Sequence, residues 1–118
     1  MEKIFSNEVV VLGSVYQIVE QTAEENPLLE DCDGCCDWTV RQIHIRREIE
    51  GTLCNMERYM KKVLRHEIVH AFLLESGLDF CTTAETWARN EEMVDWLARQ
   101  GEKIYAAWGN AGALEDTK

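Results

Sequence analysis

A long segment without glycine or proline, residues 55–76, restricts the fold of this chain more than any other part of the sequence. Asn55 is a residue type that caps helix N-termini, and Gly77 is the type that follows helix ends. Between them, apolar residues recur at helical spacing: Met60, Leu64, Ile68, Ala71 and Phe72. We therefore expect one long helix from Asn55 to about Ser76.

The first part of the chain is typical of short strands. Residues 8–12 and 15–19 are rich in β-branched and other apolar side chains. Gly13 and Ser14 between them favour a turn. We expect two strands joined by this turn.

The next part combines turn residues with an alternating segment. Residues 24–37 contain the only proline and the pair Asp33 and Gly34, which predicts a loop or a hairpin tip. Residues 38–46 alternate apolar and polar side chains, but the phase of the alternation changes within the segment. This pattern predicts a half-exposed strand, bulged and at the edge of a sheet.

Two further helices are expected after the long one. Thr82 or Thr83 can cap the first of them, and Gly101 is expected to end it. Its apolar stripe would consist of Trp87, Val94, Leu97 and Ala98. A shorter helix is expected over residues 103–108, with a frayed tail from Gly109 onward.

The chain length suits one domain with one hydrophobic core, because 118 residues are too few for two ordinary domains. We expect this domain to span residues 1–118, with an ordered part over about residues 8–108. The predicted fold class is α+β, with a small antiparallel or mixed sheet of about three strands packed on two main helices.

The long predicted helix contains the segment His66-Glu67-Ile68-Val69-His70. Residues four apart on a helix share a face, with Cβ atoms roughly 5–6 Å apart, so both imidazoles can bind one metal ion. Glu67 lies about 100° further around the helix, where it can reach a water molecule beside the metal without becoming a ligand. The motif therefore predicts a zinc site with Glu67 as general base.

A catalytic zinc ion needs three protein ligands and an open position, so the two histidines leave one ligand to find. Glu91 on the next predicted helix can supply it, which predicts about one Zn²⁺ per chain. Asp95, one turn later, can accept a hydrogen bond from a ligand histidine. Glu92 is the alternative ligand, but Glu91 is preferred because Asp95 follows it at i+4.

Two motifs carry a resemblance to gluzincins, the thermolysin-like zinc metallopeptidases: His66-Glu67-x-x-His70 and, on the second helix, Asn90-Glu91-x-x-x-Asp95. The order of elements over residues 8–100 is also similar to minimal ImmA/IrrE-type metallopeptidases associated with phages and other mobile elements. The resemblance implies a hydrolase of peptide bonds in a cytosolic protein, with His66, His70 and Glu91 as ligands, Glu67 as base and Asp95 as a supporting acceptor.

In metallopeptidases of this class, an edge strand beside the metal-binding helix binds extended substrate by strand addition. Residues 39–46 are the predicted strand. The candidate substrate contacts are Ile43, His44, Ile45 and Tyr59. Tyr59 lies two helical turns before His66 on the same face, and it is, with Arg65 and His44, a candidate for stabilising transition-state charge. Simple packing is the alternative role for Tyr59, and solvent exposure is the alternative for His44.

The five cysteines, Cys32, Cys35, Cys36, Cys54 and Cys81, form an odd set in a chain without an evident export signal, which predicts free thiols. The cluster over residues 32–36 could hold a structural zinc only with help from the isolated Cys54 and Cys81.

The net charge of -10 would repel a phosphate backbone, so nucleic acid is not expected as a partner. The start of the chain lacks the basic and long apolar parts of a signal peptide, and no segment approaches the roughly 20 apolar residues of a membrane span. We therefore expect a cytoplasmic protein without a membrane partner.

The rival function is a non-catalytic or regulatory binding protein of phage or mobile-element origin, with a structural or vestigial zinc site. Fold alone does not decide between the two functions. The intact Glu67 favours the enzyme, because a purely structural site needs no carboxylate beside the metal.

Overall fold

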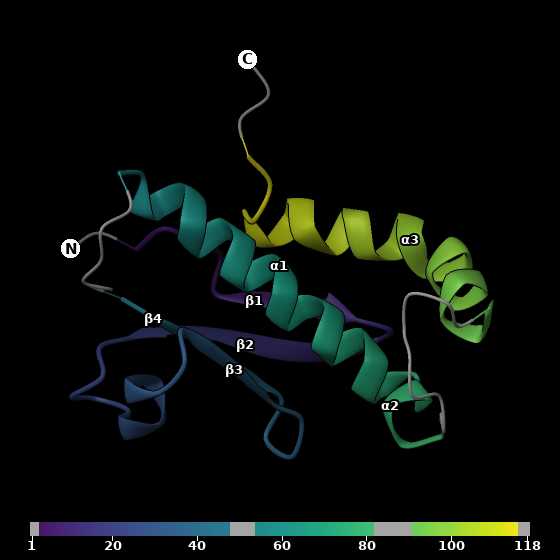
Figure 1. The fold of residues 1–118 in the computed structure, drawn as a ribbon, viewed down its shortest axis with the longest axis horizontal. Helices are drawn as coiled ribbons and strands as arrows, with labels where there is room; N and C mark the ends of the chain where they lie inside the picture. Colours follow the sequence, from purple (N-terminus) through teal and green to yellow (C-terminus); the bar gives the residue numbers. More distant parts are fainter. Residues whose placement is uncertain (1–2, 48–53, 82–90, 116–118) are drawn as a thin grey trace.

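The sheet of this protein has four strands in the order β1-β2-β4-β3 (Figure 1). They are β1 (Glu8–Val11), β2 (Ser14–Gln21), β3 (Gly34–Asp37) and β4 (Gln42–Arg46). β1 pairs with β2 and β3 pairs with β4 in antiparallel fashion, whereas β2 and β4 are parallel. The computed structural model describes residues 3–47, 54–81 and 91–115. The expected α+β class with a small mixed sheet is confirmed, with a fourth strand added.

The first two strands form the hairpin that the sequence predicts. Leu12 and Gly13 both have positive φ, 48° and 87°, as a tight two-residue hairpin turn requires. Alternate side chains of both strands are buried on one face of the sheet: Val9, Val11, Tyr16 and Ile18. This face forms the floor of the hydrophobic core.

The prediction for residues 24–46 is wrong in three respects. Residues 33 and 34 do not form a hairpin tip, because Gly34 begins β3. The turn lies instead at residues 38–41, where Arg41 has a φ of 50°, and this turn explains the phase change in the alternation. β4 lies between β2 and β3, so it is an interior strand, and β3 forms one edge of the sheet.

A short 3-10 helix, η1 (Pro27–Glu30), interrupts the predicted loop. The side chain of Asn26 accepts a hydrogen bond from the backbone N–H of Leu28 and caps it. Leu29 is fully buried, but it does not belong to the main core cluster. η1 contacts β4 and lies on the side of the sheet away from α1 (Figure 1).

The long helix, α1 (Met56–Glu75), has the predicted bounds. The side chain of Asn55 accepts a hydrogen bond of 3.0 Å from the backbone N–H of Arg58, and Gly77 adopts a φ of 82° just past the helix end. The buried face follows the helical period: Met60, Val63, Leu64, Glu67, Ile68, Ala71, Phe72 and Leu73. This face packs on β3 and β4.

The last helix, α3 (Glu91–Ala111), is longer than predicted. It passes through Gly101, so the expected stop there and the separate helix over residues 103–108 are wrong. A glycine inside a helix costs about 1 kcal/mol relative to alanine. Burial of Ile104, Ala107 and Ala111 against the core offsets this cost.

The expected fraying from Gly109 onward is also wrong. α3 continues to Ala111, Gly112 adopts a φ of 78°, and Ala113 is fully buried. The predicted caps Thr82 and Thr83 lie outside the described residues, while α2 (Leu78–Cys81) supplies one helical turn before them. None of the helices in the described ranges is long and apolar enough to cross a membrane.

α1 and α3 lie side by side on one side of the sheet, with α3 over β1 (Figure 1). At the end of α1, Glu75 accepts hydrogen bonds from the hydroxyls of Tyr16 at 2.7 Å and Ser14 at 2.8 Å, and it pairs with Arg41 at 3.5 Å. These contacts fix the end of the helix to the sheet.

Candidate metal centre

The two histidines of the motif lie next to each other on an exposed face of α1. Their Nε2 atoms are 3.1 Å apart, and their rings are edge-on, with centroids 4.8 Å apart. The i and i+4 spacing of His66 and His70 produces this geometry directly, since both side chains leave the same face one turn apart.

The spacing of the two nitrogens suits a shared metal ion. Two imidazole ligands of a tetrahedral zinc, each bonded at about 2.0–2.1 Å, have their nitrogens roughly 3.3 Å apart. The 3.1 Å between the Nε2 atoms of His66 and His70 is close to that value. The residues present therefore fit two of the ligands of a zinc ion.

Burial, followed by the positive charges of His70 and Lys62, lowers the pKa of His66 below its ordinary value. The lowered pKa keeps this imidazole neutral near pH 7, with a lone pair available. Metal binding requires the neutral form of histidine.

Glu67 is the only buried charged side chain of the described residues, at 7% exposure. Its burial raises the pKa of the carboxyl group to about 7. A general base works best when its pKa lies near the operating pH, because it must both accept and return a proton. The raised pKa places the carboxyl group of Glu67 in the range that suits proton transfer near pH 7, which the ordinary value of 4.5 does not.

A glycine of the edge strand allows the close approach that buries Glu67. A Cβ atom at position 34 would lie 2.8 Å from Cγ1 of Val63 and 3.2 Å from Cγ of Glu67. Only glycine lets β3 pack this tightly on α1. This contribution of Gly34 was missed in the sequence, where the Asp33 and Gly34 pair indicated a turn.

A groove runs between α1 and β3, past the histidine pair. One hollow, of about 390 Å³, is lined by Gly34, Cys36, His66, Glu67, His70, Leu74 and Asp79. A second, of about 230 Å³, is lined by Cys32, Asp33, Gly34, Tyr59, Lys62, Val63, His66 and Glu67. Both share Gly34, His66 and Glu67, so these residues form the middle of one continuous groove.

The strand beside this groove is β3, not the predicted residues 39–46. Ile43 and Ile45 are fully buried beneath α1. His44 faces the opposite side of the sheet, where its Nδ1 lies 2.7 Å from Oε1 of Gln21. The substrate contacts predicted for these three residues depended on an edge position that β4 does not have.

Tyr59 does line the groove, at the end nearer the start of α1. Its hydroxyl donates a short hydrogen bond to the carboxylate of Asp33, and this bond, followed by burial, raises the pKa of Tyr59. Arg65, the other candidate on α1, is directed elsewhere. Its guanidinium donates to the carbonyl oxygen of Ala113 at 2.9 Å and pairs with Glu115 at 3.6 Å.

The third ligand stays a prediction. α3 begins at Glu91, but the side chains of Glu91, Glu92 and Asp95 lie outside the described part of the structure. Among the described side chains, no three His, Cys, Asp or Glu residues are arranged to hold a metal ion.

The cysteine cluster is divided by the sheet. Cys35 and Cys36 are neighbours on β3 and therefore point to opposite faces. Cys36 lines the groove, where burial, followed by the negative charge of Glu67, raises the pKa of the thiol to about 12. Cys32, Cys35, Cys36 and Cys54 are free thiols, and Cys81 has no described side chain.

Comparison of the chain with protein-family models, with curated proteins and with solved structures finds no match.

Proposed function

We propose that this protein is a zinc-dependent metallopeptidase that hydrolyses peptide bonds in a cytosolic polypeptide. The observation that carries the proposal is the combination of two exposed imidazoles, with Nε2 atoms 3.1 Å apart, and a buried carboxylate one residue along the same helix. A structural zinc site has no use for that carboxylate, and a helix surface without a ligand gains nothing from burying it.

In this proposal His66 and His70 hold the metal, with Glu91 as the third ligand and Asp95 as the acceptor that orients a ligand histidine. When bound, a zinc ion would polarise the scissile carbonyl group and make a water molecule more acidic. These two effects are what peptide-bond hydrolysis near pH 7 requires.

Glu67 then performs the proton transfers. Its carboxylate accepts a proton from the attacking water and returns it to the leaving amine, which a group with a pKa of about 7 can do in both directions. The groove between α1 and β3 holds the polypeptide on both sides of the site. Close packing of Gly34 on Glu67 leaves only 7% of this residue exposed, at the wall of the groove.

The decisive test is Glu67→Gln, with Glu57→Gln on the exposed first turn of the same helix as the matched control. Cleavage of unfolded casein by the zinc-loaded protein is followed, with a chelator control for contaminating proteases. Because glutamine cannot accept the proton, we expect a loss of about 10²- to 10⁴-fold with unchanged zinc content and a melting temperature no lower than that of the wild type. The control should cleave as wild type does.

A wild-type cleavage rate in Glu67→Gln would contradict the mechanism. Zinc titration of the His66→Ala and His70→Ala double variant tests the metal separately, and full zinc occupancy there would contradict the site. A protein that binds zinc but cleaves nothing would favour the rival function as a regulatory binding protein.

A further inference from the structure

Different charged side chains line the two ends of the groove beside the histidine pair. Lys62, Tyr59 and Asp33 line one end, and Asp79 lines the other. The side chains of Lys62 and Asp79 are exposed, whereas Asp33 is half-buried and accepts the hydrogen bond of Tyr59. A polypeptide lying along the groove would therefore meet a positive charge on one side of His66 and a negative charge on the other.

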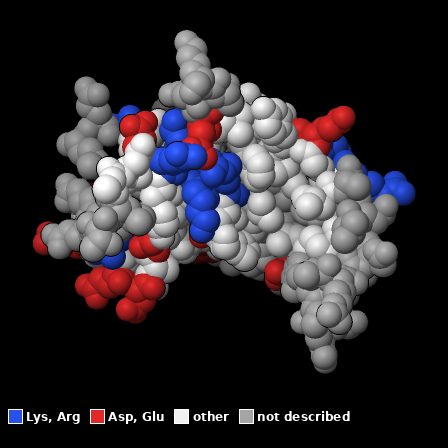
Figure 2. Space-filling model, turned by 45° about the horizontal axis from the view of Figure 1, so that its top comes forward, with Lys and Arg blue, Asp and Glu red and all other residues white. Residues whose placement is uncertain are grey.

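Lys62 belongs to a basic stripe on a protein of net charge -10. The stripe consists of Arg58, Lys61, Lys62 and Arg65, all on the first half of α1. Figure 2 shows Lys and Arg side chains gathered in one patch on this face of the molecule. Concentration of positive charge beside the groove opposes the overall field and favours a negatively charged ligand there.

The two arginines of the stripe are already paired, whereas its lysines are not paired within the described chain. Arg58 and Arg65 both form ion pairs with Glu115. No ion pair joins Lys61 or Lys62 to a carboxylate of the described residues. Asp33, which lines the same end of the groove as Lys62, accepts the hydrogen bond of Tyr59 instead.

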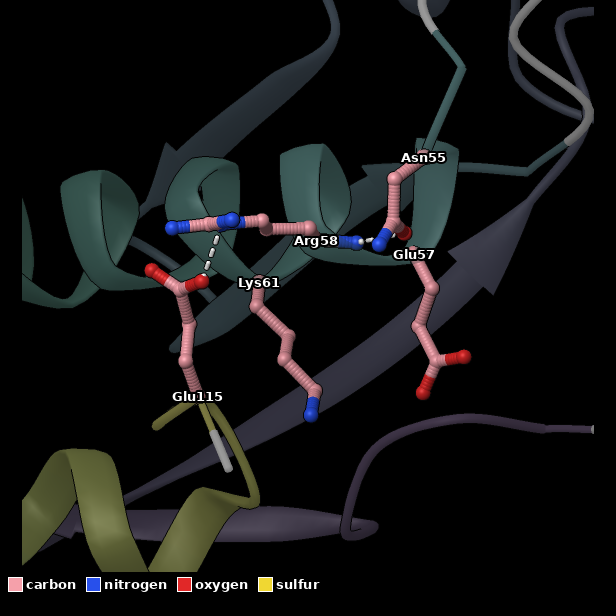
Figure 3. Close-up of a pocket in the computed structure, with 5 residues that line it drawn as sticks. All are labelled: Asn55, Glu57, Arg58, Lys61 and Glu115. Carbon is pink, nitrogen blue, oxygen red and sulfur yellow. Dashed lines mark hydrogen bonds and ion pairs between the residues drawn. The ribbon is translucent and has the colours of Figure 1, made fainter. Parts of the chain in front are cut away.

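The two lysines differ in what they face. They are consecutive and so lie about 100° apart around the helix. Lys61 lines a separate pocket with Asn55, Glu57, Arg58 and Glu115 (Figure 3). Lys62 lines the groove with His66 and Glu67. Only Lys62 can contact a chain that lies in the groove.

We propose that the groove selects a polypeptide with an acidic side chain against Lys62, and that Asp79 disfavours acidic side chains at the opposite end. The inference rests on the proposed function, because it takes the groove as the substrate site. It concerns binding, however, and can be measured without hydrolysis. The complementary charges would fix which way the substrate lies across the site.

The experiment measures binding of labelled peptides to the metal-free full chain by fluorescence anisotropy. Two peptides of the same length and sequence are compared, one with glutamates and one with glutamines in one half. We expect the wild type to prefer the glutamate peptide about fivefold, the effect of one exposed charge pair at close range. Lys62→Gln should abolish the preference and Lys62→Glu should reverse it.

Lys61→Glu is the matched control, with the same charge change one residue away, at a side chain that lines a separate pocket and not the groove. It should keep most of the preference of the wild type. Asp79→Asn should tighten binding of a peptide with glutamates in both halves by up to about fivefold. Melting temperatures confirm that each variant is folded.

Equal loss of preference in Lys61→Glu and Lys62→Glu would overturn the inference, because it would indicate diffuse attraction to the whole stripe. Tighter binding of a single-stranded oligonucleotide than of the glutamate peptide would overturn it as well. If casein is never cleaved but the Lys62-dependent preference is found, the proposed hydrolysis fails and the charge selection stands. Cleavage of casein without any charge preference would support the proposed hydrolysis and overturn the charge selection.

Discussion

Glu67 and Glu75 lie about two turns apart on the same helix, yet their surroundings shift their pKa values in opposite directions. Burial alone raises the pKa of Glu67 to about 7. At Glu75 burial also acts to raise the pKa, but hydrogen bonds from Tyr16 and Ser14 and the charge of Arg41 outweigh it and lower the value.

The difference shows that the donors around a carboxylate, and not the helix that carries it, decide the direction in which its pKa shifts. Two hydroxyl donors and a guanidinium stabilise the charged form of Glu75, so this residue works as an anchor between α1 and the sheet. Glu67 packs against Gly34, which offers close contact and no charge. The same side chain is therefore a structural ion at one position and a candidate base at the other.

The largest effect on stability is expected for Glu75→Ala. The change leaves the hydroxyl of the buried Tyr16 without its acceptor and removes the partner of Arg41. We expect the free energy of unfolding to fall by about 3 kcal/mol, measured by urea denaturation. Glu102→Ala, at an exposed position of α3, should change it by less than about 0.5 kcal/mol. Equal effects of the two variants on the free energy of unfolding would contradict the role of Glu75 as an anchor between α1 and the sheet.

Gly34→Ala should be next in size, because the new methyl group collides with Val63 and crowds Glu67. We expect a loss of about 1–3 kcal/mol, as is usual for overpacking. Gly101→Ala provides the matched control, since nothing lies within 4 Å of a Cβ atom there. In that helical position alanine should stabilise the protein by about 0.5–1 kcal/mol. The same sign for both variants in denaturation experiments would contradict the close approach of β3 to α1.

Glu67→Gln should stabilise the metal-free protein when the pH exceeds the value of about 7 to which burial raises the pKa. The amide has nearly the same shape but removes a buried charge, so we expect a gain of about 1 kcal/mol. Glu75→Gln should instead lower the stability under the same conditions. Thermal melts of both variants, with a chelator present, measure the contrast. A destabilised Glu67→Gln would mean that donors to this carboxylate matter more than its burial.

The smallest effect is expected for the stabilising contribution of Glu75 at acidic pH. Because the pKa of Glu75 is lower in the folded protein, its stabilising contribution is complete above the ordinary value of 4.5 and is lost as the pH falls through the folded value. The difference in unfolding free energy between wild type and Glu75→Gln should therefore shrink on acidification below that pH. Urea denaturation over a pH series measures it, and a constant difference would contradict the lowered pKa.

Much of the helix that carries the candidate site follows from local sequence. Asn55, Gly77 and the apolar period predict α1 with its observed ends, and the i and i+4 spacing predicts the adjacent imidazoles of His66 and His70. These features depend on residues within one helix, so no knowledge of the rest of the fold is needed.

What the sequence could not predict depends on contacts between distant segments. β3, with the sequence Gly-Cys-Cys-Asp, has no strand pattern of its own and is held by pairing with β4. The helix break expected at Gly101 fails because burial of neighbouring side chains outweighs the cost of one glycine. The edge strand was therefore assigned to the wrong segment, and the close packing of Gly34 on Glu67 was not foreseen.

The hydrogen bonds of Ser6 have a consequence for the order of folding. Its hydroxyl donates to the carbonyl oxygen of Asn110 across a separation of 104 residues, whereas Tyr59 reaches Asp33 across only 26. Two doublings of loop length add roughly 1.2 kcal/mol of closure entropy. We therefore expect α1 and β3 to dock early and the Ser6 contact to close late, so that mutations at Ser6 would speed unfolding more than they slow folding.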